Sequence, residues 1–115
     1  MEISAGGNSA VVEGFAALAD PFRLRILDRL RKSDATISTL SDELGMAAPS
    51  VSKHVSVLSR AGFVIKHVEA QRRRCSLAPE GFARLGEWSK DYEALWSDRL
   101  ARLEVMLDEI EDPRC

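Results

Sequence analysis

The sequence predicts a mainly helical domain that carries one small β-hairpin. Apolar residues recur at steps of three and four along most of the chain, and Asp-Pro and glycine residues mark helix starts and ends. A single short run, Phe63–Val68, is β-branched enough for a strand. The length of 115 residues suits one domain with a modest core. We expect residues 9–111 to form this domain and residues 1–8 to be a flexible lead-in.

The first two helices are expected at Ser9–Ala19 and from Pro21 onward. Asp20 and Pro21 mark the second start, because aspartate caps a helix N-terminus and proline fits the first helical position. The first helix has its apolar residues at Val11, Val12, Phe15, Ala16 and Leu18. The second helix is expected to direct four apolar side chains into the core, those of Leu24, Ile26, Leu27 and Leu30.

Two further helices joined by a tight turn are expected next. Thr36–Ser38 is typical of an extended link, with Ser38 as the N-cap of a third helix that ends at Gly45. A turn of a few residues follows, and Pro49 begins a fourth helix that Gly62 stops. The apolar positions of this fourth helix follow steps of four and three, at Val51, Val55 and Leu58.

A hairpin and a long helix complete the predicted fold. Phe63–Val68 is expected to be one strand, residues 69–73 a polar tip, and residues 74–77 the returning strand. Pro79 then begins a last helix that runs to about Ile110.

Charge is distributed unevenly along the chain. The formal net charge is −2, which is not that of a simple basic nucleic-acid binder. Residues 50–74, however, hold six basic side chains and one acidic one, whereas residues 104–112 hold five acidic side chains and no basic one. A DNA-binding surface needs a local positive field and not a positive total. The distribution therefore suits a protein with one DNA-binding face.

Other features bear on the cellular location and the redox state. No apolar run approaches the roughly 20 residues of a membrane helix, and residues 1–8 lack the basic and apolar regions of a signal peptide. We expect a cytoplasmic protein with no membrane partner. Cys75 and Cys115 belong to no CxxC pair and are predicted to be free thiols.

The helix–turn–helix from Ser38 to Ala61, followed directly by a basic hairpin, indicates DNA binding. In such a motif the second helix lies in the major groove, where serine and lysine side chains can reach bases or phosphates. The hairpin would act as a wing whose arginines enter a minor groove or clamp phosphates. A polar helix face or an arginine triplet by itself is more often only a solvated surface, but their order and spacing together favour DNA binding. The predicted DNA-binding residues are Ser50, Ser52, Lys53, His54, Ser56, Gln71, Arg72, Arg73 and Arg74.

Three segments resemble the ArsR/SmtB family of bacterial winged-helix repressors. They are LADPFRLRILDRL at residues 18–30, LSDELGMAAPSVSKHVSVLSRAGFV at 40–64 and RRRCSLAPEG at 72–81. The resemblance covers nearly all of residues 10–110. It implies a winged helix-turn-helix with five helices and a β-hairpin between the fourth and fifth, dimerising through the first and last helices. By position, it puts Ser50, Ser52, Lys53 and His54 on the recognition helix and Arg72, Arg73 and Arg74 on the wing.

The resemblance also bears on metal binding. Metal-sensing members of the family carry CVC at the start of the third helix, where this chain has Thr36, Ile37 and Ser38. A second family site uses histidine and acidic ligands on the last helix, which contains neither His54 nor His67, the two histidines here. Zinc and related ions need several nitrogen, sulfur or oxygen ligands at one point. We therefore expect no metal and no cofactor, as in a metal-free subgroup.

The last helix carries an apolar stripe that persists for about seven turns, longer than a small domain can cover with its own core. Packing within the monomer is one interpretation, but large exposed stripes are uncommon on monomers. We expect a homodimer in which two recognition helices meet an inverted-repeat operator. The spacing WxxxYxxxW resembles the metal-free subgroup, whose members often repress their own operons. The predicted interface residues are Val12, Phe15, Trp88, Tyr92, Leu95, Trp96, Leu100, Leu103 and Leu107.

The leading hypothesis is a sequence-specific repressor of double-stranded DNA. One alternative is a redox-responsive version, since Arg74 could lower the pKa of the Cys75 thiol, or a version that responds to an unknown effector at the dimer interface. Another is a protein–protein adaptor that lost DNA binding, against which Lys53 and the wing arginines argue. We expect no enzyme, because no Ser/His/Asp set, carboxylate pair or glycine-rich phosphate loop can be assembled.

Overall fold

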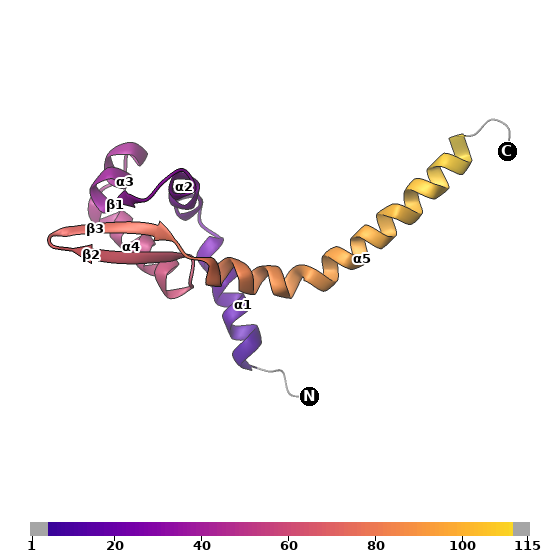
Figure 1. Ribbon diagram of the computed structural model, residues 1–115, viewed down its shortest axis with the longest axis horizontal. Helices are drawn as coiled ribbons and strands as arrows, with labels where there is room; N and C mark the ends of the chain where they lie inside the picture. The colour runs from indigo at the N-terminus through magenta and orange to yellow at the C-terminus, as the bar shows by residue number, and fades with distance from the viewer. Residues whose placement is uncertain (1–4, 112–115) are drawn as a thin grey trace. The chain divides into compact units, whose positions relative to one another are not determined.

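The computed structural model describes the backbone of residues 5–111 and the side chains of residues 9–110. The chain forms two compact units, residues 1–85 and 86–115. The expected fold class is confirmed, since the described residues are mainly helical with a small antiparallel sheet (Figure 1). The elements are α1 (Ala5–Leu18), α2 (Pro21–Leu30), β1 (Ala35–Thr36), α3 (Ile37–Leu44), α4 (Ala48–Arg60), β2 (Val64–Glu69), β3 (Arg72–Leu77) and α5 (Pro79–Glu111).

Helix α1 begins earlier than expected. Residues 5–8 are helical, so the lead-in expected over residues 1–8 was too long, and residues 1–4 lie outside the described range. The face of α1 that turns to the core is formed by Gly14 and Ala17. The Cβ that an alanine would add at Gly14 would lie 3.0 Å from Cδ2 of Leu85, so the small residue permits close packing there. Val12 and Phe15 remain exposed on the outer side.

Helix α2 starts as the sequence predicts. Asp20 accepts hydrogen bonds from the backbone N–H groups of Phe22 and Arg23 at 2.8 and 3.1 Å, with Pro21 in the first position. The inward face is made of Ile26, Leu27 and Leu30. Leu24 was wrongly assigned to this face and is 46% exposed, because its position lies about 110° around the helix from the centre of that face.

Helix α3 is capped by Thr36 and not by Ser38. Thr36 ends strand β1 in an extended conformation, and its Oγ1 accepts the backbone N–H of Thr39 at 3.1 Å. The extended link is therefore shorter than expected, because its last two residues, Ile37 and Ser38, already belong to the helix. The expected end is confirmed, since Gly45 adopts the left-handed conformation (φ 66°).

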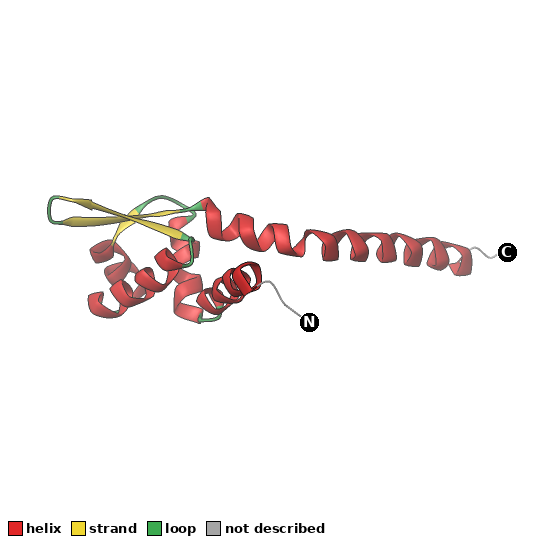
Figure 2. Ribbon diagram, turned by 90° about the horizontal axis from the view of Figure 1, so that it is seen from below, coloured by secondary structure: helices red, strands yellow, loops and turns green. Residues whose placement is uncertain are grey.

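The hairpin tip is also shorter than expected. Strands β2 and β3 pair without interruption from Val64↔Leu77 to Glu69↔Arg72, so only Ala70 and Gln71 form the turn. The five-residue tip over residues 69–73 is therefore wrong: a two-residue turn keeps the ladder in register. Strand β3 also pairs with β1, which makes a three-stranded sheet of order β1-β3-β2 beside the helices (Figure 2).

The core of residues 1–85 lies between these helices and the base of the sheet. The inward positions of α4 are confirmed, since Val51, Val55 and Leu58 are fully buried. A hydrogen bond joins the start of α5 to the segment before β2, since the Gly81 N–H donates to the Gly62 carbonyl at 2.8 Å. Gly62 itself ends the α4 segment with φ 85°, a conformation that favours glycine.

Residues 86–111 continue α5 as a helix, which confirms the expected long last helix. Its apolar stripe is exposed on the described chain, including Trp88, Tyr92, Leu95, Trp96, Leu100, Leu103, Met106, Leu107 and Ile110. No helix within residues 5–111 is both long and apolar enough to span a membrane.

Candidate nucleic-acid interface

The outer face of α4 forms a shallow hollow whose lining includes two serines and two cationic side chains. It is lined by Pro49, Ser52, Lys53, Ser56, Val57 and Arg60, which recur at steps of three and four opposite the buried side of the helix. None of these lining residues is acidic. The structure thus brings together Ser52, Lys53 and Ser56, as the sequence predicts. It adds Arg60, which could have been found because it stands seven residues, or two turns, after Lys53.

His54 lies away from this hollow. Its ring stacks on that of Phe22, with 6.0 Å between ring centroids, and its Nδ1 lies 3.3 Å from Nη1 of Arg23. Arg23 in turn donates from Nε to the Ala17 carbonyl at 2.6 Å. His54 therefore joins α4 to α2. Ser50, in the first turn of α4, is exposed.

The wing, defined here as residues 64–77, contacts α4 through Lys66. Nζ of Lys66 donates to Oγ of Ser56 at 3.2 Å. Lys66 pairs in register with Cys75, whose side chain is buried, so this face of the hairpin is the one that turns to the helices. Arg73 shares that face, because side chains alternate along a strand. Sequence reasoning counted Lys66 in the basic run but did not assign it to the site.

Arg74 is held by two carboxylates. Its Nη2 lies 2.8 Å from Oε1 of Glu69, and its Nη1 donates to Oδ2 of Asp34. The hydrogen bonds to Glu69 and then to Asp34 raise the pKa of Arg74 further above its ordinary value. Within the described part of the chain, Arg72 and Arg73 form no such ion pair. Arg74 therefore braces the wing, whereas Arg72 and Arg73 keep uncompensated charges.

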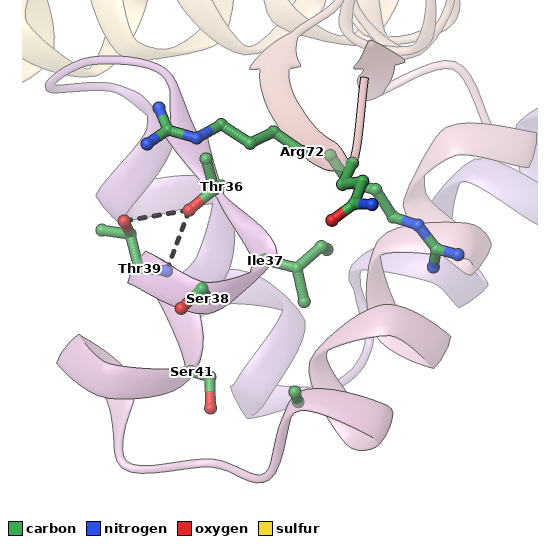
Figure 3. A pocket seen from close by; sticks show the side chains of 9 residues that line it. Thr36, Ile37, Ser38, Thr39, Ser41 and Arg72 are labelled. Atoms are coloured by element: carbon green, nitrogen blue, oxygen red, sulfur yellow. Dashed lines mark hydrogen bonds between the residues drawn. The ribbon is translucent and has the colours of Figure 1, made fainter. Parts of the chain in front are cut away.

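A second hollow, of about 570 Å³, lies between the wing and the start of α3 (Figure 3). In Figure 3 the hydroxyls of Thr36 and Thr39 are hydrogen-bonded to each other, at 3.0 Å. Ser41 is also engaged, since it donates to the Met46 carbonyl. The hollow, called the wing pocket below, is lined by Thr36, Ile37, Ser38, Thr39, Ser41, Ala48, Gln71, Arg72 and Arg73.

Cys75 has the environment of a core residue. Its side chain is 0% exposed. Burial raises the pKa of the thiol, although the charge of Lys66 opposes the shift in part. A raised pKa disfavours the reactive thiolate, whereas the redox-responsive alternative needs a pKa that Arg74 lowers. Cys115 lies outside the described residues.

The donor set does not fit a transition metal at the start of α3. Thr36 and Ser38 offer hydroxyl oxygens where zinc and related ions prefer thiolate or imidazole. Across the residues whose placement the structure gives, no three His, Cys, Asp or Glu side chains gather closely enough to hold a metal ion.

Comparison with known proteins identifies the fold and the family. A family model described as a helix-turn-helix domain matches residues 18–67. The crystal structure of an ArsR family transcriptional regulator is 32% identical, has a TM-score of 0.68, and is matched over 84% of this chain and 97% of that one. The chain belongs to the ArsR family of winged helix-turn-helix transcriptional regulators. Its α3 and α4 are the helix-turn-helix of that family, and β2 and β3 are the wing.

Two other comparisons extend this result. The transcriptional repressor SdpR of Bacillus subtilis is 33% identical over 57 residues, which cover 50% of this chain and 63% of that protein. The solution structure of a homodimeric winged helix-turn-helix DNA-binding domain from Mycobacterium bovis is 26% identical, with a TM-score of 0.66, over 82% of this chain and 87% of that domain. This ArsR-family chain is thus a DNA-binding transcription regulator.

Proposed function

We propose that this ArsR-family chain is a repressor that binds an inverted-repeat operator as a homodimer, without a metal ion. The observation that carries the proposal is the outer face of α4, where Lys53, Arg60 and two serines stand clear of the core and next to Lys66 of the wing. Such a helix can enter the major groove, where lysine and arginine reach guanine acceptors and serine reaches bases or phosphates.

Dimerisation is proposed from the surface of α5 and from a relative. The stripe along α5 exposes two tryptophans, the single tyrosine and several leucines, which are typical interface anchors. The Mycobacterium bovis domain is homodimeric. A two-fold axis would set the two α4 helices about 34 Å apart or a multiple of that, which matches an inverted repeat. Val12 and Phe15 of α1 are part of the proposed interface.

Repression follows from where such a dimer binds. A protein seated on a promoter excludes RNA polymerase, and SdpR, a relative, is a transcriptional repressor. We include the promoter of the chain's own operon among the proposed targets. Metal independence is supported by the hydroxyl side chains at the start of α3 and by the lack of a three-ligand cluster among residues with described side chains.

Selection of bound fragments from a random double-stranded pool tests the proposal. We expect an inverted repeat, two copies of the chain per duplex by sedimentation, and an affinity that neither EDTA nor added Zn²⁺ changes. A chain that stays monomeric, or that prefers no duplex over random sequence at moderate salt, contradicts it. In that event the adaptor interpretation gains, and capture of DNA by a Lys53→Ala, Arg60→Ala variant as strongly as by the wild type would support it further.

A further inference from the structure

We propose that the wing pocket receives one phosphate of the DNA backbone, bound jointly by Arg72 of the wing and Ser38 of α3. This inference rests on the proposed function, because it assumes that the chain binds duplex DNA through α4 and the wing. It adds the start of α3 as a third part of the fold that contacts the duplex. The pocket is the hollow of about 570 Å³ between the wing and α3.

The lining of the wing pocket has the chemistry of an anion site. It combines two guanidinium groups, from Arg72 and Arg73, with an amide from Gln71 and several hydroxyls. No acidic residue lines it. Guanidinium groups bind phosphate through short, charge-assisted hydrogen bonds, and hydroxyls add neutral ones. A cation would meet repulsion there, and an apolar ligand would leave the polar groups without partners.

Four polar side chains of the lining are available to a ligand. The hydroxyls of Thr36, Thr39 and Ser41 are occupied within the protein. Among the described side chains of the lining, those of Ser38, Gln71, Arg72 and Arg73 are exposed and have no hydrogen-bond partner. Arg73 lies on the same face of the hairpin as Lys66 and Cys75, whereas Arg72 lies on the other face. The carboxylates of Glu69 and Asp34 are ion-paired with Arg74, and among the described residues neither forms an ion pair with Arg72.

The position of the wing pocket suits the backbone. Ala48, at the start of α4, forms one wall, and residues of the wing form another. If α4 occupies the major groove and the wing an adjacent minor groove, the sugar–phosphate strand that separates the two grooves passes between them. A phosphate of that strand therefore meets the pocket. The N–H groups in the first turn of α3 add to the positive potential without forming a site by themselves.

The test uses the operator obtained by selection, with single phosphates replaced by neutral methylphosphonates, one position at a time. For the wild-type protein, we expect one position in each half-site to weaken binding about tenfold, the loss expected for a charged hydrogen bond. In the Arg72→Gln and Ser38→Ala variants, the methylphosphonate at that position should reduce the operator affinity much less than it does in the wild type. The double variant should lose less than the product of the two single losses, because both groups bind one phosphate. The matched control is Arg31→Gln, an exposed arginine directly after α2 and outside the pocket.

Isothermal titration with inorganic phosphate, in the absence of DNA and at constant ionic strength, distinguishes a backbone phosphate from a free one. We expect no saturable binding in the millimolar range. Saturable binding that Arg72→Gln abolishes would overturn the backbone assignment and make the pocket a free-anion site. Tight operator binding with no phosphate position that depends on Arg72 or Ser38 would also overturn the inference, while the proposed function would stand. Failure of the wild type to bind any duplex would instead overturn both.

Discussion

Nζ of Lys66 lies 3.2 Å from Oγ of Ser56, so the wing and the proposed recognition helix share a hydrogen bond. The bond places a wing cation at the rim of the hollow lined by Lys53 and Arg60. If a duplex binds α4 as proposed, it therefore also meets Lys66.

Replacing Lys66 with methionine should weaken DNA binding and reduce its salt dependence. If Lys66 neutralises one phosphate, the slope of log affinity against log salt should become shallower by about 0.9. Fluorescence anisotropy titrations at several salt concentrations measure this slope. Lys32→Met is the matched control, since Lys32 is an exposed lysine near the end of α2, and its slope should equal that of the wild type. An unchanged slope for Lys66→Met would remove Lys66 from the interface.

Removing Arg74 should loosen the wing without removing a DNA contact. In Arg74→Ala both ion pairs are lost, and amide hydrogen exchange in β2 and β3 should accelerate, while the salt slope of DNA binding stays near that of the wild type. Asp34→Asn should reproduce part of the faster exchange. Because these groups are solvent-exposed, the melting temperature should move little. A slope that becomes shallower by about 0.9 would mean that Arg74 itself binds a phosphate.

Gly81→Ala should destabilise the fold, because the added Cβ would lie 2.7 Å from the Phe63 ring and 2.8 Å from the Ala61 carbonyl oxygen. Overpacking of this kind costs about 1–3 kcal/mol. The matched control is Gly86→Ala in the same helix, where nothing lies within 4 Å. That change should stabilise the helix by up to about 1 kcal/mol. Urea unfolding measures the free energy of unfolding of both variants. Equal values for Gly81→Ala and Gly86→Ala would contradict the close packing at Gly81.

The Cys75 thiol should make stability depend on pH only in the alkaline range. Its pKa is raised in the folded chain by burial, so the unfolded chain loses this proton at a lower pH than the folded one. The contribution of the Cys75 thiol to the free energy of unfolding is fully present below the pKa of the unfolded thiol, about 8.5. It is lost as the pH rises toward the higher pKa of the folded chain. Urea unfolding between neutral and alkaline pH should show the loss in the wild type and not in Cys75→Ala.

The same burial predicts how Cys75 responds to oxidants. Brief peroxide treatment should leave the operator affinity unchanged, because an inaccessible, protonated thiol reacts slowly. Anisotropy before and after treatment measures it, with Cys75→Ala as the control. An affinity that falls in the wild type and not in the variant would support the redox-responsive alternative.

The sequence alone determined the order of the helices and the inward face of α4. Asp20-Pro21 and Gly45 act through local geometry, a side-chain cap and a left-handed backbone, and Val51, Val55 and Leu58 repeat with the helical period. Short-range signals of this kind depend on neighbours within a few residues, so they can be recognised without the fold. The length of the last helix was predictable for the same reason.

Tertiary structure decided which polar residues remain for a ligand. Three arginines in a row look equivalent, yet Arg74 is bound to Asp34, forty residues away, while Arg72 is not. His54 is likewise directed to Phe22 and Arg23, and Thr36 replaces Ser38 as the cap because β1 pairs with β3. Such assignments depend on contacts between residues far apart in the chain. The local pattern carries no information about them, since a polar side chain on a helix or strand is compatible with solvent, a protein partner or DNA.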